Sequence, residues 1–282
     1  MTDWYERALA TAPESRSVEV DGARIHYRSW GGEGLPVVLV HGGAAHSGWW
    51  DHVAPHLATE NHVLALDLSG HGDSDHRATY SLELWAHEVL AVAAAESDRK
   101  PLVIGHSMGG FVSLTAAREL GERLRGVAAI DSPVIEQSSE TKARRAERGD
   151  SVSLRCHEDR DALVARFRTI PEDPHQIEPI VRHIAEQSVV GTDEGWRWKF
   201  DPHVFLTASM SPEDVAESVC PVALIRGELG LATSDITADV RARLGGNVPV
   251  TVIPAGGHHL MLDQPVALIA VLETLIGQWR HS

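Results

Sequence analysis

Short runs of apolar residues recur along the chain and alternate with segments in which apolar residues have helical spacing. The helical spacing is clearest over residues 82–95 and 111–120. Continuous apolar runs are typical of strands buried on both faces, and strands that alternate with helices form mostly parallel, doubly wound sheets. Six such runs read PVVLVHGG, HVLALDLSG, PLVIGHS, GVAAIDS, PVALIRG and PVTVIPAGG.

Two further strands precede these runs. Residues 17–20 and 23–30 flank the pair Asp21-Gly22, which is typical of a tight turn between two strands of a hairpin. The pattern as a whole therefore predicts an α/β fold, in which eight strands form a mostly parallel, doubly wound sheet.

The interval between GVAAIDS and PVALIRG breaks this rhythm. Residues 133–220 contain no convincing buried strand, and long loops without structure are uncommon in compact domains. We therefore expect a helical insertion after the sixth strand: a lid of residues 134–218 over the carboxyl edge of the sheet. Residues 1–133 and 219–282 then form the core. The interval includes a charged stretch (ETKARRAERGD), an amphipathic one (EDRDALVARFRTI) and the aromatic-rich GWRWKFDPHVF.

Composition narrows the range of partners. A formal charge of −15 without an extended run of Lys or Arg argues against nucleic acid. The first residues mix charges with short apolar steps, so we expect neither a signal peptide nor a membrane span. Cys156 and Cys220 are far apart in the sequence, which makes a disulfide or zinc site unexpected and a reducing cytoplasm the default. The histidines form no HExxH motif or His/Cys cluster, so no metal is expected.

A serine between two glycines follows the strand PLVIGHS. Gly105-His106-Ser107-Met108-Gly109 fits the pattern G-x-S-x-G between a strand and a helix, where a sharp turn exposes the serine Oγ. An N-cap serine is the simpler alternative, because serine often begins a helix. The context of strand and helix favours Ser107 as a nucleophile.

Two other strand ends carry groups that could act with this serine. Gly43 lies in the glycine-rich end of the third strand, and its N–H together with that of Met108 could stabilise an oxyanion. After the last strand, His258 and His259 are candidates for the general base, because loops at the carboxyl ends of parallel strands meet at one edge of the sheet.

Taken together, HGG, DLSGHGDSD, GHSMGG and GHHLMLDQP resemble the α/β-hydrolase superfamily, in the chain order serine, acid, histidine. The resemblance covers residues 17–280 apart from the insertion, and the spacing within GHHLMLDQP places the base on His258. It implies a hydrolase that needs no cofactor. Within DLSGHGDSD, the matching residues form a structural turn rather than part of the catalytic group.

The acid departs from the usual family pattern. The position after the seventh strand where most relatives carry it is Gly230, which has no side chain. Some relatives carry the acid after the sixth strand, where this chain has Asp131, so we predict Asp131 as the partner of His258. The rivals are Glu228, Asp235 and Asp263.

These residues predict a serine hydrolase that cleaves an ester, thioester or lactone of a small to medium organic substrate. A carbon–carbon hydrolase or an acyltransferase would use the same triad, and a ligand receptor with a vestigial triad is a third class. Oligomeric state is left open between monomer and homodimer. Aromatic residues often line ligand pockets, so four tryptophans are candidate wall residues: Trp49, Trp50, Trp196 and Trp198.

Overall fold

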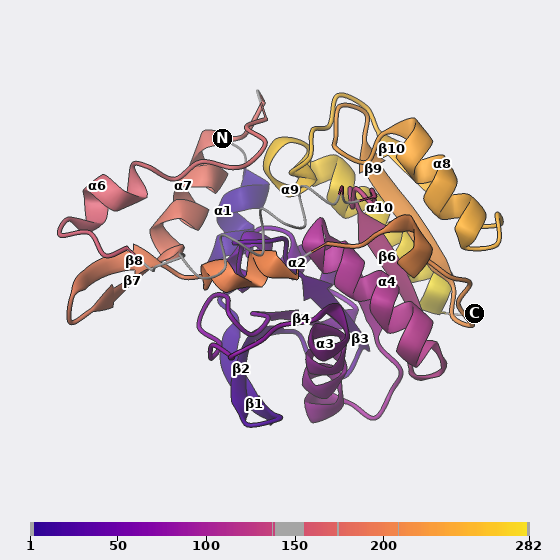
Figure 1. Ribbon diagram of the computed structural model, residues 1–282, viewed down its shortest axis with the longest axis horizontal. Coiled ribbons are helices and arrows are strands. Elements are labelled where there is room, and N and C mark those ends of the chain that lie inside the picture. Colours follow the sequence, from indigo (N-terminus) through magenta and orange to yellow (C-terminus); the bar gives the residue numbers. More distant parts are fainter. Residues whose placement is uncertain (1–2, 137, 139–154, 174, 208, 281–282) are drawn as a thin grey trace.

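The computed structural model describes residues 3–136, 138, 155–173, 175–207 and 209–280. Eight of the described strands form one sheet in the order β1-β2-β4-β3-β5-β6-β9-β10 (Figure 1). The pairs β1–β2 and β2–β4 are antiparallel, and the other neighbouring pairs are parallel. The predicted sheet is confirmed. Its strands are β1 (Glu14–Val20), β2 (Ala23–Trp30), β3 (Leu35–Val40), β4 (Asn61–Leu66), β5 (Leu102–His106), β6 (Gly126–Ile130), β9 (Val222–Gly227) and β10 (Val250–Ile253).

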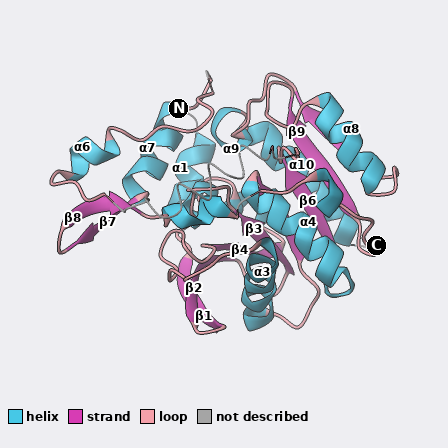
Figure 2. Ribbon diagram, viewed as in Figure 1, coloured by secondary structure: helices cyan, strands magenta, loops and turns pink. Residues whose placement is uncertain are grey.

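Helices cover both faces of this sheet (Figure 2). Alternate residues of the central strands divide between two hydrophobic clusters: Val38 and Val40 pack with α3, α4 and α8, whereas Val37 and Leu39 pack with α1, α2 and α10. This explains why the central strands read as continuous apolar runs. The helices of the core are α1 (Asp3–Ala10), α2 (Ala54–Leu57), α3 (Leu82–Glu96), α4 (Met108–Leu120), α8 (Ser234–Arg243), α9 (Leu260–Asp263) and α10 (Pro265–Arg280).

The described part of the segment between β6 and β9 lies outside the main sheet. Residues 137, 139–154, 174 and 208 of the predicted lid lie outside the described residues. Its described part is not purely helical, because two short strands pair as an antiparallel hairpin at one end of the molecule (Figure 1). The sequence analysis did not predict this hairpin. The segment contains α6 (Arg160–Val164), α7 (Glu178–Gln187), β7 (Val189–Thr192), β8 (Gly195–Trp198) and the short 3₁₀ helices η3 (Pro202–Leu206) and η4 (Pro212–Asp214).

A buried carboxylate joins this segment to the core. Both carboxylate oxygens of Asp51 accept hydrogen bonds from Nη1 of Arg28 on β2, at 2.6 Å. One of them also accepts from α7, through His183 Nε2 at 2.8 Å and Gln187 Nε2 at 3.1 Å. Burial alone would raise the pKa of Asp51, but the contacts with His183 and Arg28 outweigh it and hold the pKa below its ordinary value. Asp51 therefore ties α7 to the sheet as an ionised group.

Replacement of Asp51 by alanine is expected to lower the free energy of unfolding by about 3 kcal/mol, since it leaves Arg28 largely buried without its partner. Urea denaturation measures this. The matched control is Glu178→Ala, which breaks an exposed ion pair with Arg182 on the same helix and should cost less than about 1 kcal/mol. Equal losses for the two variants would contradict the role given to Asp51.

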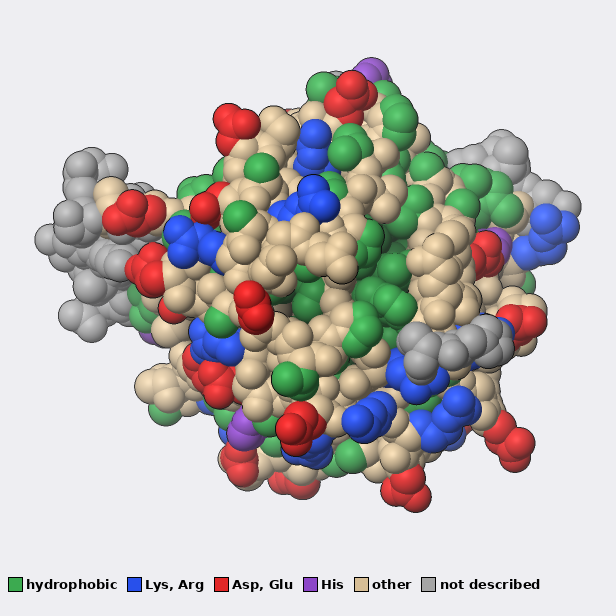
Figure 3. Space-filling model, turned by 90° about the vertical axis from the view of Figure 1, so that its right-hand side faces the viewer, with side chains coloured by type: hydrophobic (Ala, Val, Ile, Leu, Met, Phe, Trp, Pro, Cys, Tyr) green, Lys and Arg blue, Asp and Glu red, His purple; other side chains and the backbone are tan. Residues whose placement is uncertain are grey.

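Hydrophobic side chains gather near the middle of the face in Figure 3, and acidic side chains lie mostly toward its outline. None of the described helices combines the length and the apolar character that crossing a membrane requires.

Candidate active site

Ser107 occupies a strained turn between β5 and α4. Its backbone has φ +55° and ψ −117°, and its N–H donates to the carbonyl of Ile130 at 2.9 Å. The flanking glycines make the turn possible: a Cβ at Gly105 would lie 2.0 Å from the carbonyl oxygen of Gly109, and one at Gly109 would lie 2.4 Å from the carbonyl oxygen of Val40. Such strain in the backbone is common at functional sites.

A chain of hydrogen bonds runs from Ser107 through His258 to Asp131. His258 Nδ1 lies 2.6 Å from Asp131 Oδ2, and His258 Nε2 lies 3.1 Å from Ser107 Oγ. Because Nδ1–H is donated to the carboxylate, Nε2 carries the lone pair that accepts the serine proton. The side chains of Asp131 and His258 are buried, and they come from the ends of two different strands of the sheet.

The position of Asp131 depends on Gly230. Besides His258, its carboxylate accepts the N–H of Leu231 at 2.8 Å and that of Gly227 at 3.3 Å. A Cβ at position 230 would lie only 2.1 Å from Asp131 Oδ1. The carboxylate therefore fills the space into which a side chain at position 230 would project. An acid at Asp131, after β6, thus requires a glycine at the position after β9 where most relatives carry the acid.

Gly230→Ala is expected to displace the Asp131 carboxylate and lower turnover on the order of a hundredfold, the loss typical of a catalytic group shifted by about 1 Å. Steady-state kinetics on an ester would measure it. The matched control is Gly32→Ala, because a Cβ at position 32 would meet nothing within 4 Å. Gly246→Ala would not serve, because Gly246 has a positive φ and alanine there would be strained. Full activity in Gly230→Ala would show that the close approach of position 230 to the Asp131 carboxylate does not affect turnover.

The rival carboxylates lie elsewhere. Glu228 Oε2 accepts the N–H of Ala255 at 2.9 Å, and Asp235 is in the first turn of α8. Asp263 ends α9, and its Oδ2 accepts the N–H of Gly257 at 2.5 Å. None of these contacts involves a ring nitrogen of His258.

Gly43 and Met108 lie on the wall of the same cavity as Ser107. Met108 is the first residue of α4, where backbone N–H groups lack partners within the helix. In the described part of the chain, no hydrogen bond uses the backbone N–H of either residue. Both groups are therefore available to a ligand oxygen beside Ser107.

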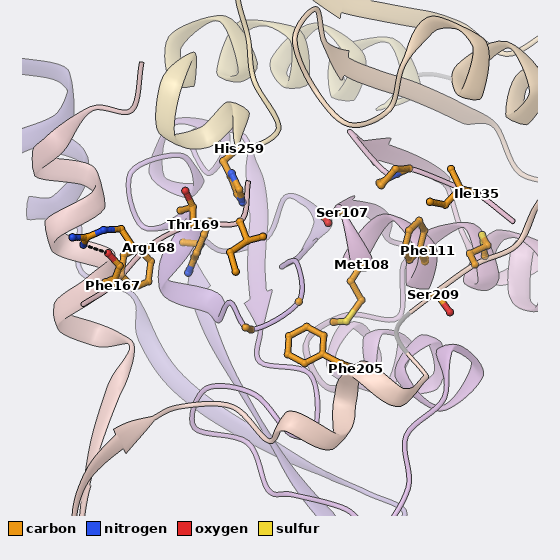
Figure 4. A pocket seen from close by; sticks show the side chains of 16 residues that line it. Ser107, Met108, Phe111, Ile135, Phe167, Arg168, Thr169, Phe205, Ser209 and His259 are labelled. Atoms are coloured by element: carbon orange, nitrogen blue, oxygen red, sulfur yellow. Dashed lines mark hydrogen bonds between the residues drawn. The ribbon is translucent and has the colours of Figure 1, made fainter. Parts of the chain in front are cut away.

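The cavity has a volume of about 400 Å³ and lies between the core and the inserted segment (Figure 4). Its size falls in the usual range for small-molecule sites. Most of the wall is apolar, and the inserted segment supplies a large part of it. Its lining residues include Trp49, Phe111, Phe167, Arg168, Thr169, Phe205 and His259.

The four tryptophans predicted as candidate wall residues lie in different places. Trp49 lines the cavity, but Trp50 is fully buried in the core, and Trp196 and Trp198 belong to the β7–β8 hairpin. Trp50 packs in the core, and neither it nor Trp196 or Trp198 is among the described residues that line this cavity. Phe205, which lies in the same aromatic-rich stretch, reaches the wall instead.

A second histidine–aspartate pair lies beside the first. His259 Nδ1 donates to Asp173 Oδ2 at 2.7 Å, and the same carboxylate accepts the backbone N–H groups of His258 and His259 at 3.1 Å each. Burial alone would raise the pKa of Asp173, but these hydrogen bonds outweigh it and hold the pKa at about 2. The sequence analysis did not single out Asp173, because an aspartate in an irregular segment carries no signal of its tertiary partner.

One group of described residues could offer ligands to a metal: His26, Asp67 and Asp73. Asp67 already accepts hydrogen bonds from His26 Nδ1 at 2.7 Å and from the backbone N–H groups of Ser47 and Asp73. Asp73 also pairs with Lys199. These contacts fit the structural turn predicted for DLSGHGDSD.

Comparison with known proteins identifies the family. Residues 37–271 match the alpha/beta hydrolase family. The chain belongs to this family. It is therefore an enzyme of the hydrolase class, as the sequence predicted.

Two relatives match almost the whole chain. An esterase of Mycobacterium tuberculosis is 25% identical over 277 residues, which cover 96% of this chain and 92% of the relative. A 2-(acetamidomethylene)succinate hydrolase of Mesorhizobium japonicum is 25% identical over 275 residues, covering 93% of this chain and 95% of the relative.

Solved structures share the fold. The crystal structure of E-2-(acetamidomethylene)succinate hydrolase has a TM-score of 0.80 at 24% identity, covering 94% of this alpha/beta hydrolase and 99% of that chain. A thioesterase domain from the curacin biosynthetic pathway has a TM-score of 0.79 at 23% identity, covering 93% and 99%. At these identities the likeness concerns the fold alone.

Proposed function

We propose that this alpha/beta hydrolase cleaves carboxylic esters of small to medium organic substrates, including thioesters or lactones, through a Ser107–His258–Asp131 triad. The observation that carries the proposal is the hydrogen-bonded chain from Ser107 Oγ to His258 and Asp131, at the edge of an apolar cavity of about 400 Å³. The M. tuberculosis relative, which is named an esterase, supports the same reaction.

Ser107 Oγ attacks the ester carbonyl carbon while His258 Nε2 takes the serine proton. The tetrahedral intermediate collapses to an acyl-enzyme, and the alcohol leaves with the proton from His258. Water, activated by His258, then attacks the acyl carbon, and Ser107 regains its proton as the acid is released. Throughout, Asp131 holds the imidazole in the tautomer with the proton on Nδ1 and stabilises its charged form.

The backbone N–H groups of Gly43 and Met108 stabilise the oxyanion in this mechanism. Both residues border the cavity beside Ser107, and the N-terminus of α4 adds a positive field at the same point. The described part of residues 134–218 acts as the lid: Phe167 and Phe205 shape the cavity and limit the entry of water.

Hydrolysis of p-nitrophenyl esters graded by acyl length tests the proposal. A cavity of this volume is expected to favour short and medium acyl chains, with kcat/KM falling for long ones. Thioesters and lactones of similar size complete the panel. Wild-type protein that hydrolyses none of the esters, thioesters or lactones would overturn the proposed function.

A carbon–carbon hydrolase is the second candidate. Part of the chain, covering 46% of it, is 30% identical to a 2-hydroxymuconate semialdehyde hydrolase of a Pseudomonas strain. Turnover of 2-hydroxymuconate semialdehyde in preference to matched esters would favour this candidate. A cytoplasmic location, a monomeric or dimeric state and the absence of nucleic-acid and membrane partners remain predictions.

A further inference from the structure

His259 has one ring nitrogen fixed and the other unused. Its Nδ1 is bound to Asp173, whereas Nε2 has no hydrogen-bond partner in the part of the chain that the structure describes. The residue is 5% exposed, yet it lines the cavity next to Ser107 (Figure 4). A polar atom of a buried side chain that has no partner within the protein, beside a ligand cavity, can accept a hydrogen bond from the ligand.

The ring is held in place from several sides. Its centroid lies 4.7 Å from that of His258 and 5.6 Å from that of Trp49, while Asp173 fixes the orientation through Nδ1 and the backbone N–H. Asp173 itself comes from the inserted segment, so that segment positions a polar group beside the proposed base. A group that is preorganised in this way loses little entropy when it binds.

Nε2 is a hydrogen-bond acceptor in this arrangement. Burial lowers the pKa of His259 below its ordinary value, so the imidazole is neutral at pH 7. With its single proton on Nδ1, donated to Asp173, Nε2 presents a lone pair to the cavity. A hydroxyl or an amide N–H of a ligand would complement it.

Three other polar side chains of the wall belong to Arg168, Thr169 and Ser209, and the first two already make hydrogen bonds within the protein. Arg168 Nη1 donates to the carbonyl oxygens of Ala165 and Phe167, and Figure 4 shows the guanidinium turned toward Phe167. Thr169 Oγ1 accepts a hydrogen bond from Gln176. These contacts occupy Nη1 of Arg168 and Oγ1 of Thr169.

We infer that His259 is a specificity-determining residue that accepts a hydrogen bond from a hydroxyl or amide N–H close to the scissile carbonyl. The inference rests on the proposed function and narrows its substrate class to hydroxylated or acylamino esters. It assigns to His259 a role separate from that of His258, since His259 binds substrate and takes no part in proton transfer with Ser107.

The test uses matched ester pairs. In each pair one ester carries a hydroxyl or acetamido group at a given carbon of the acyl or alcohol part, and the other carries the O-methyl or N-methyl analogue. Wild-type protein is expected to favour the donor ester by about tenfold in kcat/KM at one position or more, as one hydrogen bond of about 1.4 kcal/mol would give.

His259→Phe keeps a ring but removes the acceptor, so the ratio within each pair should fall to about one. His259→Gln retains an amide oxygen and should keep part of the preference. Phe205→Leu is the matched control: it alters the same wall without a polar atom, so both members of a pair should change by the same factor.

Two results would overturn the inference: equal kcat/KM within every pair for wild-type protein, or an unchanged ratio in a folded His259→Phe variant. Circular dichroism checks the fold, and the wild-type comparison stands without any variant. Hydrolysis of both esters of every pair with equal kcat/KM would contradict this inference alone. A protein that hydrolyses no ester, thioester or lactone would contradict the proposed function.

Discussion

Replacing Ser107 by alanine is expected to lower turnover by about a million-fold while the protein stays folded, because no other group can form the acyl-enzyme. The variant lacks only the Oγ that lies 3.1 Å from His258 Nε2. Alanine keeps the Cβ, so the strained turn between β5 and α4 should persist. Ester hydrolysis by wild type and variant measures the loss, and circular dichroism checks the fold.

A fluorophosphonate probe gives an independent readout. It should label wild-type protein at Ser107 and leave Ser107→Ala unlabelled. Ser113 is the internal control and should stay unlabelled in the wild-type protein, because its hydroxyl is buried within α4 and donates to the carbonyl of Gly109. Labelling at any other residue, or an alanine variant that retains most of its activity, would remove Ser107 from its proposed role.

Asp131→Asn is expected to cost about 10⁴ in turnover, as the equivalent change does in a serine-protease triad. The asparagine amide can present an N–H to His258 Nδ1, which would then lack its proton, so Nε2 would carry the proton and could not accept that of Ser107. The side chain keeps its size, so the contacts around Gly230 should change little. Single-turnover kinetics would separate slower acylation from slower deacylation.

Glu228→Gln and Asp235→Asn are the controls for this loss. Both carboxylates lie near the end of β9 but neither contacts a ring nitrogen of His258. Each variant should lose less than about tenfold in turnover. A larger loss in either of them than in Asp131→Asn would move the acid away from Asp131.

Six strands of the sheet could be predicted from apolar runs, because burial on both faces forces central strands to be continuously apolar, and β1 and β2 from the Asp21-Gly22 turn between them. The β7–β8 hairpin escaped prediction because its strands have four residues each and stand outside the main sheet. Short, partly exposed strands of this kind carry no long apolar run. The N-terminal helix α1, with eight residues, was missed for a similar reason.

The strand–turn–helix motif indicated Ser107, whereas the resemblance to the α/β-hydrolase superfamily placed the base on His258 and, because Gly230 has no side chain, the acid on Asp131. Asp173 and the cavity-facing Nε2 of His259 could not be predicted in the same way, because their pairing depends on how the inserted segment packs against the loop after β10. The aromatic-rich stretch is compatible with packing as well as with ligand binding. Only the fold shows that Phe205 lines the cavity whereas Trp198 belongs to strand β8.

The close approach between Asp131 and position 230 also restricts how this enzyme could have evolved. A lineage that moves its acid from one strand end to the other needs two substitutions, and each alone is expected to be harmful. A side chain gained at position 230 collides with Asp131, whereas loss of Asp131 leaves His258 without a carboxylate. The two arrangements are therefore separate fitness peaks, and the substitutions that connect them should show strong sign epistasis.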